Sequence, residues 1–481
     1  MNVFEGLEPA SVFRFFEEIC NIPHGSGNEK QLSDYLKKFA EDRGIFCIQD
    51  KWNNIIMIKE ATKGYEEEEP LILQGHMDMV AVCDPDRPVD MATWPIRLER
   101  EGDWIYAQGT SLGGDDGIAV AYIMGILDAE DIAHPRLEAI LTVDEERGMN
   151  GAREIDLSML KGRRMINLDN EEEGVLLASC AGGARVVCTL PLVKEKKSGI
   201  LLSIQVYGLT GGHSGVEIQK WGGNAICILA RVLDDMRQKT SLEIVSVEGG
   251  EADNAIPTDA EAYFWIPEEE IANAIEVIHD SSIELKEEFR KREKNLSIVL
   301  KEESADVISC VKRPYSDKII DFLLAMPNGI QAMSKDVEGL VESSLNLGKV
   351  HLEGKELRVT FSLRSSVNTA KEAMYEKLQS ICKLAGARAE ISGDYPGWEY
   401  KENSPLRDKM IRIYEEMYGK EPKIQAIHAG LECGLFSDKL PGLDCISYGP
   451  DMYHIHTIKE RISIYSVQSV WKYLLEILKQ K

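Results

Sequence analysis

The sequence lacks long apolar runs: no window approaches the ~18 consecutive apolar residues that a membrane-spanning helix needs. Positive charge is also scarce, since 55 Lys and Arg residues stand against 81 Asp and Glu residues and give a formal charge of −26. Nucleic-acid binding needs a basic surface, and this balance argues against one. We therefore expect neither a membrane nor a nucleic acid among the partners of this chain.

Paired cysteines of the metal-binding or redox type are missing as well. The ten cysteines are scattered, and none forms a C-x-x-C pair. The first residues, Met1–Gly6, lack the basic stretch and following apolar stretch of a signal peptide. Free thiols and no leader are typical of a reducing compartment, so we expect a cytoplasmic protein.

The 481 residues, 44% of them hydrophobic, are too many for one compact core and indicate two or three domains. Helices and strands alternate over residues 1–183 and again over 395–481, which predicts an α/β domain with a mostly parallel mixed sheet flanked by helices. Residues 184–394 instead contain alternating, half-exposed strands and a long charged helix at 271–296. We expect an inserted α+β domain here, interrupting the α/β domain.

Acidic and imidazole side chains stand where predicted strands of the α/β domain end or where a helix begins. Ligands in open α/β sheets gather beyond the carboxyl ends of the strands, which would bring these side chains together. Histidines and carboxylates without cysteine suit zinc, cobalt or manganese, and the surplus of carboxylates favours two metals bridged by one Asp. The residues are His76 and Asp78, Asp115, Glu145 and Glu146, Asp169, and, after a strand near the C-terminus, His454 or His456.

Each of these clusters also has an ordinary structural interpretation. Asp115 is as well suited to capping the following helix as to binding a metal. Glu145 and Glu146 are typical of a solvated strand end, and Asp169 of an acidic turn. Their joint occurrence, each at the end of an element, favours the metal site.

Four longer motifs stand out in the sequence: Cys20–His24, Gln74–Val80, Thr110–Ile118 and His428–Phe436. They resemble the dinuclear zinc peptidases, a superfamily that includes carboxypeptidase G and peptidases T and V, and within it the bacterial aminoacyl-histidine dipeptidases. The similarity runs from the first predicted helix to the last. It implies a zinc-peptidase-like catalytic domain, an inserted lid domain over residues 184–394, and hydrolysis of Xaa-His dipeptides such as β-alanyl-histidine.

The resemblance also implies a set of metal ligands. His76 and Asp169 would hold one metal, Glu146 and His456 the other, and Asp115 would bridge them. The metals would be two divalent ions, Zn²⁺ with Co²⁺ or Mn²⁺ as alternatives.

The same resemblance assigns the catalytic carboxylates. Glu145 would be the general base, and Asp78 the carboxylate that orients His76. The peptide bond between Asp115 and Asp116 is expected to be cis.

The last ligand is a choice between two histidines. The H-x-x-x-E frame from His456 to Glu460 favours His456 over His454, although Lys459 stands where relatives often have an acid. His454 therefore stays open as the alternative.

Three residues of the insertion resemble substrate-binding residues of the lid. In Gly211–Gly215, His213 would reach the scissile carbonyl, while Asn254 and Arg364 would hold the C-terminal carboxylate. The planar fork of arginine pairs bidentately with carboxylates. Without the resemblance, a surface position would be the preferred interpretation of His213 and Arg364.

The sequence thus predicts a metal-dependent dipeptidase that acts on small peptides. A tripeptidase or an N-acyl amino acid deacylase of the same superfamily is the enzymatic alternative. A non-catalytic peptide-binding protein is disfavoured, because such a protein would be expected to lose Glu145 or a ligand. The sequence assigns no role to His428, Glu432 or Cys433, and it leaves open whether the chain forms a homodimer.

Overall fold

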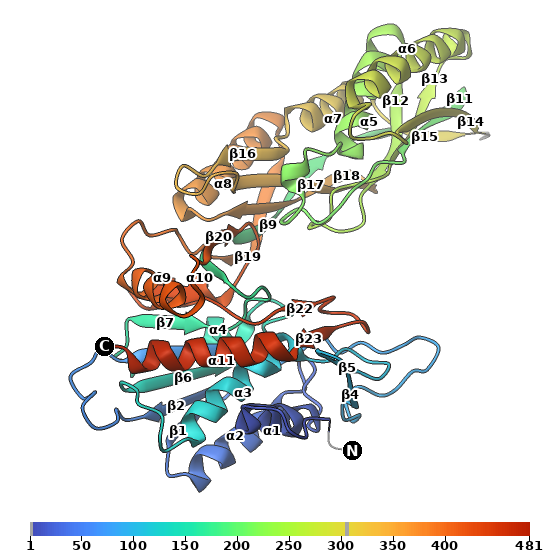
Figure 1. The fold of residues 1–481 in the computed structure, drawn as a ribbon. Coiled ribbons are helices and arrows are strands. Elements are labelled where there is room, and N and C mark those ends of the chain that lie inside the picture. Colours follow the sequence, from blue (N-terminus) through green and yellow to red (C-terminus); the bar gives the residue numbers. More distant parts are fainter. Residues whose placement is uncertain (1–2, 304–306) are drawn as a thin grey trace. The chain divides into compact units, whose positions relative to one another are not determined.

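The computed structural model describes residues 3–303 and 307–481. The chain forms two compact units, and the second is inserted into the first (Figure 1). The first unit consists of Met1–Ser179, Trp398–Ala426 and Leu431–Lys481, and the second of Cys180–Gly397 and Ile427–Gly430.

The first unit is built on an eight-stranded mixed sheet. In spatial order its strands are β1 (Phe46–Gln49), β2 (Ile55–Lys59), β6 (Leu137–Thr142), β3 (Leu71–His76), β7 (Arg164–Asn167), β21 (Asp444–Ser447), β8 (Val175–Cys180) and β20 (Lys423–Ile427). Parallel pairings join β6, β3, β7 and β21 in the centre, while β1–β2, β2–β6 and β21–β8 are antiparallel. This confirms a mixed α/β sheet, but the prediction of a mostly parallel one was wrong, because three of the described pairings are parallel and three are antiparallel.

Helices cover both faces of this sheet. Alternate residues of a strand point to opposite faces, and Leu71 and Leu73 of β3 belong to the main hydrophobic core, whereas Gln74 contacts Glu432 on the other side. The helices sharing that main core are α1 (Ala10–Cys20), α2 (Lys30–Asp42), α3 (Gly114–Asp128), α9 (Pro405–Tyr418) and α11 (Ile464–Lys479). On the Gln74 face lies α10 (Glu432–Lys439), which packs with the short α4 (Asn150–Glu154).

A smaller sheet of four strands completes the first unit. Its order is β22 (Met452–Tyr453), β23 (Arg461–Ser463), β5 (Trp104–Ala107) and β4 (Leu98–Glu101). The antiparallel pair β22–β23 fixes both ends of the loop that carries His456 and Glu460. Tyr453 contacts Trp104 edge to face, and Arg461 lies over the same indole ring.

The second unit is built on a nine-stranded sheet in which every described pairing is antiparallel. Its strands are β14 (Ser297–Glu303), β11 (Ile200–Tyr207), β13 (Ala260–Ile266), β12 (Glu243–Gly249), β17 (Val341–Glu353), β18 (Glu356–Ser365), β9 (Gly182–Pro191) and β19 (Arg388–Tyr395), with β16 (Gly329–Met333) beside β17. A separate pair joins β10 (Lys194–Lys197) to β15 (Ile308–Val311). Buried and half-buried residues alternate along β13, because helices pack on one face only.

The helices of the second unit are α5 (Ala225–Lys239), α6 (Ile271–Phe289), α7 (Arg313–Ala325) and α8 (Asn368–Ala385), with short 3₁₀ turns at Ile218–Lys220 and Glu268–Glu270. The predicted helix 271–296 was wrong at its end, because α6 stops at Phe289. Glu293 turns inward instead, and its buried carboxylate accepts hydrogen bonds from the backbone N–H groups of Thr210 and Gly223, each at 2.7 Å. These bonds hold residues after Phe289 in a turn.

Within the described part of the chain, no helix is both long and apolar enough to cross a membrane.

Candidate metal centre

The carboxyl ends of three neighbouring strands bring the predicted ligands together. His76 is the last residue of β3, Glu145 and Glu146 follow β6, and Asp169 follows β7. Because β6, β3 and β7 are adjacent and parallel, these ends meet at one edge of the sheet. The Nε2 atom of His76 lies 3.4 Å from an oxygen of Asp169.

Asp115, at the start of α3, lies between two imidazoles. Its Oδ1 atom is 3.1 Å from Nε2 of His76, and its Oδ2 atom is 3.0 Å from Nε2 of His456. A carboxylate with one oxygen toward each imidazole has the arrangement of a bridging ligand. The peptide bond that follows Asp115 is cis, as expected.

His456, rather than His454, lies at this cluster. Its Nε2 atom is 2.9 Å from Oε1 of Glu146 in addition to its contact with Asp115. The His456 side chain is 43% exposed, whereas those of Asp115 and Glu146 are each 8% exposed. The cluster is therefore buried on its sheet side and open to solvent at His456.

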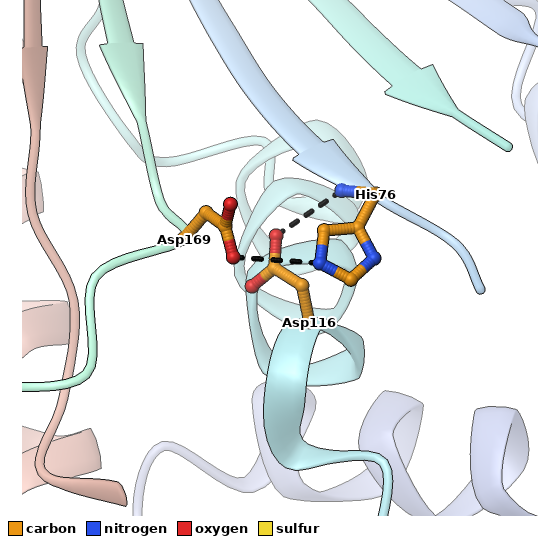
Figure 2. Close-up of side chains that lie close together, drawn as sticks. All are labelled: His76, Asp116 and Asp169. Carbon is orange, nitrogen blue, oxygen red and sulfur yellow. Dashed lines mark hydrogen bonds and ion pairs between the residues drawn. The ribbon is translucent and has the colours of Figure 1, made fainter. Parts of the chain in front are cut away.

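Asp116 is a neighbour of the cluster that the sequence did not point to. Figure 2 shows its carboxylate beside His76 and Asp169, where Oδ2 accepts a hydrogen bond from the His76 backbone N–H at 3.1 Å. Among the residues that the structure describes, three groups of side chains have ligand atoms within 4.8 Å of one another and are suited to a metal ion. These groups are His76, Asp116 and Asp169; His76, Glu145 and Glu146; and Asp115, Glu146 and His456.

Asp78 contacts His76 differently from the expectation. The Nδ1 atom of His76 lies 2.9 Å from the backbone oxygen of Asp78 but 3.6 Å from its carboxylate. The carboxylate accepts hydrogen bonds from the N–H groups of Glu145 and Glu146, at 3.0 and 3.2 Å, and from the Ser26 hydroxyl at 2.8 Å. Asp78 therefore orients His76 mainly through its backbone, and its side chain fixes the turn that carries the two glutamates.

The negative charges of the carboxylates in this cluster need cations to balance them. Among the described residues, no Lys or Arg side chain forms an ion pair with Asp115, Glu146 or Asp169. Burial raises the pKa of Asp169 to about 6 against the lowering effect of His76, and repulsion from Asp115 and Glu146 adds to the rise. Buried carboxylates and imidazoles without a basic partner fit divalent metal ions.

Glu145, the expected general base, lies at the same cluster. Burial raises its pKa well above the ordinary range, and the neighbouring carboxylates of Asp169 and Glu432 act in the same direction against His76. A carboxyl group with a raised pKa beside a metal site is suited to accepting and returning a proton.

Glu460 holds the loop that presents Asp115, a role that the sequence analysis missed. Its buried carboxylate accepts four backbone N–H bonds, from Leu112, Gly113, Gly114 and Asp115, at 2.8 to 3.3 Å. Gly113 has φ +70°, and a Cβ atom there would lie 2.7 Å from the Met79 sulfur, so this loop needs glycine. The H-x-x-x-E frame from His456 to Glu460 is the sequence signal that points to this residue.

A second cluster of predicted residues lies in the inserted unit. A Cβ atom added to Gly215 would lie 3.0 Å from Cε1 of His213, 3.2 Å from Cζ of Arg364 and 2.8 Å from the backbone oxygen of His428. Burial and then the charge of Arg364 lower the pKa of His213. The Arg364 side chain is buried, and its Nε atom has no hydrogen-bond partner within the described ranges.

Asn254, the third predicted residue of the insertion, lines a cavity together with His213. The two residues line one cavity of about 890 Å³, and the Asn254 backbone oxygen accepts a hydrogen bond from the N–H of Ser214 at 2.8 Å. His428 donates or accepts through Nε2 at 2.7 Å from the Ser344 hydroxyl. The insertion therefore brings His213 close to Arg364 and to Asn254.

Comparisons with known proteins agree with this geometry. Residues 72–480 match the model of "Peptidase family M20/M25/M40". The chain is 36% identical over 482 residues to the cytosol non-specific dipeptidase of Escherichia coli (strain K12), covering 100% of this chain and 99% of that protein. The sheet, the carboxylate and imidazole cluster and these matches define a metallopeptidase, and the chain belongs to peptidase family M20/M25/M40.

Solved structures extend the comparison. The aminoacylhistidine dipeptidase from Vibrio alginolyticus matches with a TM-score of 0.93 at 35% identity, covering 100% of this chain and 99% of that one. The aminopeptidase PepT from Bacillus cereus ATCC 10987 has a TM-score of 0.56 at 17% identity over 98% of both chains, a likeness of fold alone. The resemblance inferred from the sequence motifs is confirmed, since the relatives from Escherichia coli and Vibrio alginolyticus, each over 30% identical across the full chain, are named dipeptidases.

Proposed function

We propose that this chain is a two-metal dipeptidase that hydrolyses Xaa-His dipeptides. The observation that carries the proposal is the position of Asp115, whose two carboxylate oxygens face one imidazole each. His76 and Asp169 would hold one ion, Glu146 and His456 the other, and Asp115 both. Zn²⁺ suits this donor set, with Co²⁺ and Mn²⁺ as alternatives.

Two metal ions, when bound, would acidify water enough for deprotonation near neutral pH and would polarise the scissile carbonyl. Glu145 accepts the proton from the attacking water and delivers it to the leaving amine, as base and then acid. Asp78 holds the backbone of Glu145 for this task through the N–H bond at 3.0 Å.

The inserted unit would supply the groups that recognise the substrate. Arg364 is buried beside His213 and has an unpaired Nε–H among the described residues, which suits a bidentate contact with a free carboxylate. We assign the C-terminal carboxylate of the dipeptide to Arg364 and Asn254, and the developing oxyanion to His213.

A substrate panel tests the proposal. The names of the two full-length relatives differ, since one specifies aminoacyl-histidine and the other non-specific dipeptides. We expect Xaa-His dipeptides, including β-alanyl-histidine, to be cleaved at least about tenfold more efficiently, as kcat/KM, than tripeptides and N-acetyl amino acids, a difference of roughly 1.4 kcal/mol. Preferred cleavage of tripeptides would identify a tripeptidase, preferred release of acetate a deacylase, and absence of turnover with metal bound a peptide-binding protein.

Replacing Arg364 with Ala should lower kcat/KM for dipeptides by about 10²-fold, because a hydrogen-bonded charge pair contributes roughly 1.5–3 kcal/mol. The loss should appear mainly in KM, and it should vanish with C-terminally amidated dipeptides, which offer no carboxylate. Arg358→Ala is the matched control, because Arg358 lies on the same strand but is half exposed and pairs with surface glutamates. An equal loss on amidated and free dipeptides would contradict the assignment.

We also propose a cytoplasmic location. The relative from Escherichia coli is named a cytosol dipeptidase, and the ten cysteines of this chain are free thiols, as is usual in a reducing compartment.

A further inference from the structure

Glu432, the first residue of α10, is a buried acid without a basic partner. It is 0% exposed, and within the described chain no Lys or Arg forms an ion pair with it. Glutamates are almost never fully buried unless they are paired. A carboxyl group kept in such a place at a cost in free energy points to a specific task.

Glu432 joins a hydrogen-bonded chain of side chains. Its Oε2 atom accepts hydrogen bonds from Nε2 of Gln74 at 2.5 Å and from the Thr142 hydroxyl at 2.6 Å. Gln74 in turn accepts a hydrogen bond from Nδ2 of Asn167 at 2.5 Å. All four side chains are 0% exposed, so these bonds form without competition from solvent. We call these four residues the polar brace.

The polar brace lies next to the metal centre, on the residues that precede the ligands along the strands. Gln74 is on β3 two residues before His76, and Asn167 is on β7 two residues before Asp169. Gln74 is the register partner of Asn167 on β7, and His76 is the register partner of Thr142 on β6. The brace therefore spans the three strands whose ends carry the ligands.

Because brace residues and ligands lie on the same strands, a shift of the brace would also move the ligands. Residues two apart on a strand point to the same face, so Gln74 and His76 share the face that Glu432 covers. A change in the packing of Gln74 or Asn167 would rotate or shift the strand end that follows. Residues beyond the ligands that orient them commonly change metal affinity by about 10- to 100-fold when they are replaced.

We propose that Glu432 is a positioning residue that fixes the spacing of the three strand ends and so sets the metal affinity of the site. This inference rests on the proposed two-metal function. The carboxyl group acts as a double hydrogen-bond acceptor at the point where two strands meet α10. Burial raises the pKa of this carboxyl group to about 8.

The test measures zinc affinity of the full-length protein by competition with a chromogenic chelator, after stripping and reloading the metal. We expect Glu432→Ala to weaken zinc binding by about 10- to 100-fold. Glu432→Gln should restore affinity to within about threefold of wild type, because its amide oxygen accepts the same two hydrogen bonds.

Glu138→Ala is the matched control. Glu138 is also 0% exposed and lies on β6, but at the opposite end of the strand, where it accepts N–H bonds from Lys161 and Gly162. Its loss should lower the melting temperature and leave zinc affinity unchanged. Should Glu432→Ala fail to fold, Thr142→Val removes one donor of the brace and keeps the side-chain shape, and we expect it to weaken zinc binding several-fold.

A Glu432→Ala variant with wild-type zinc affinity would overturn the inference. If Glu432→Ala does not fold, wild-type zinc affinity in Thr142→Val would overturn it instead. So would an equal loss of affinity in Glu138→Ala. A wild-type protein that binds no zinc, cobalt or manganese would instead overturn the proposed function, so the two failures are distinguishable.

Discussion

Replacing Glu145 with Gln should lower kcat by about 10²- to 10⁴-fold while the protein retains both metal ions. General acid–base catalysis contributes a factor of this size, and the amide cannot accept the proton of the attacking water. The measurement combines kcat on the best Xaa-His dipeptide with metal content of the same sample by mass spectrometry.

The neighbouring glutamate provides the contrast for this variant. Glu146→Gln should lose metal as well as activity, because Oε1 of Glu146 lies 2.9 Å from His456 within a candidate ligand group. Full activity in metal-replete Glu145→Gln would remove Glu145 from the reaction, whereas metal loss in that variant would make it a ligand.

Replacing Asp115 with Ala should have the other large effect. The variant should fall below two bound metals, and kcat/KM should fall by at least about 10³-fold, since metal ions contribute several kcal/mol of transition-state stabilisation. In the proposed centre Asp115 would contact both ions, so its loss should affect both sites. Metal content and kcat/KM measured on one preparation check this expectation.

Asp128→Ala is the control for this change. Asp128 ends the same helix, α3, and forms exposed ion pairs with Arg14 and Arg43, far along the helix from the cluster. Its replacement should leave metal content unchanged. Two tightly bound metals in Asp115→Ala would contradict the bridging assignment.

The positions of the candidate ligands could be predicted because strand order and strand ends follow from local pattern. Apolar runs before His76, Glu145 and Asp169 predicted three strands, and the parallel arrangement of β6, β3 and β7 brings their ends together. The family resemblance added the roles of these residues and the preference for His456 over His454, both of which lie far along the chain.

Contacts that depend on the three-dimensional path of the backbone could not be predicted. Nothing local to Asp78 indicates that its backbone oxygen, rather than its carboxylate, lies closest to His76. The end of α6 depends on the inward turn of Glu293 toward Thr210 and Gly223, which are distant in sequence. The sequence around Asp116 does not predict that its carboxylate lies beside His76 and Asp169, as the structure shows.

The loop held by Glu460 has a consequence for biosynthesis. Chains emerge from the ribosome N-terminus first, and folding units form in that order. The ligand residues at the three strand ends and Asp115 are synthesised early. His456 and Glu460 are synthesised only after the whole inserted unit. A nascent chain therefore carries an incomplete cluster and a loop without its carboxylate partner. With His456 as a metal ligand, as proposed, peptidase activity would begin only in the nearly finished polypeptide, after the rest of both units has been synthesised.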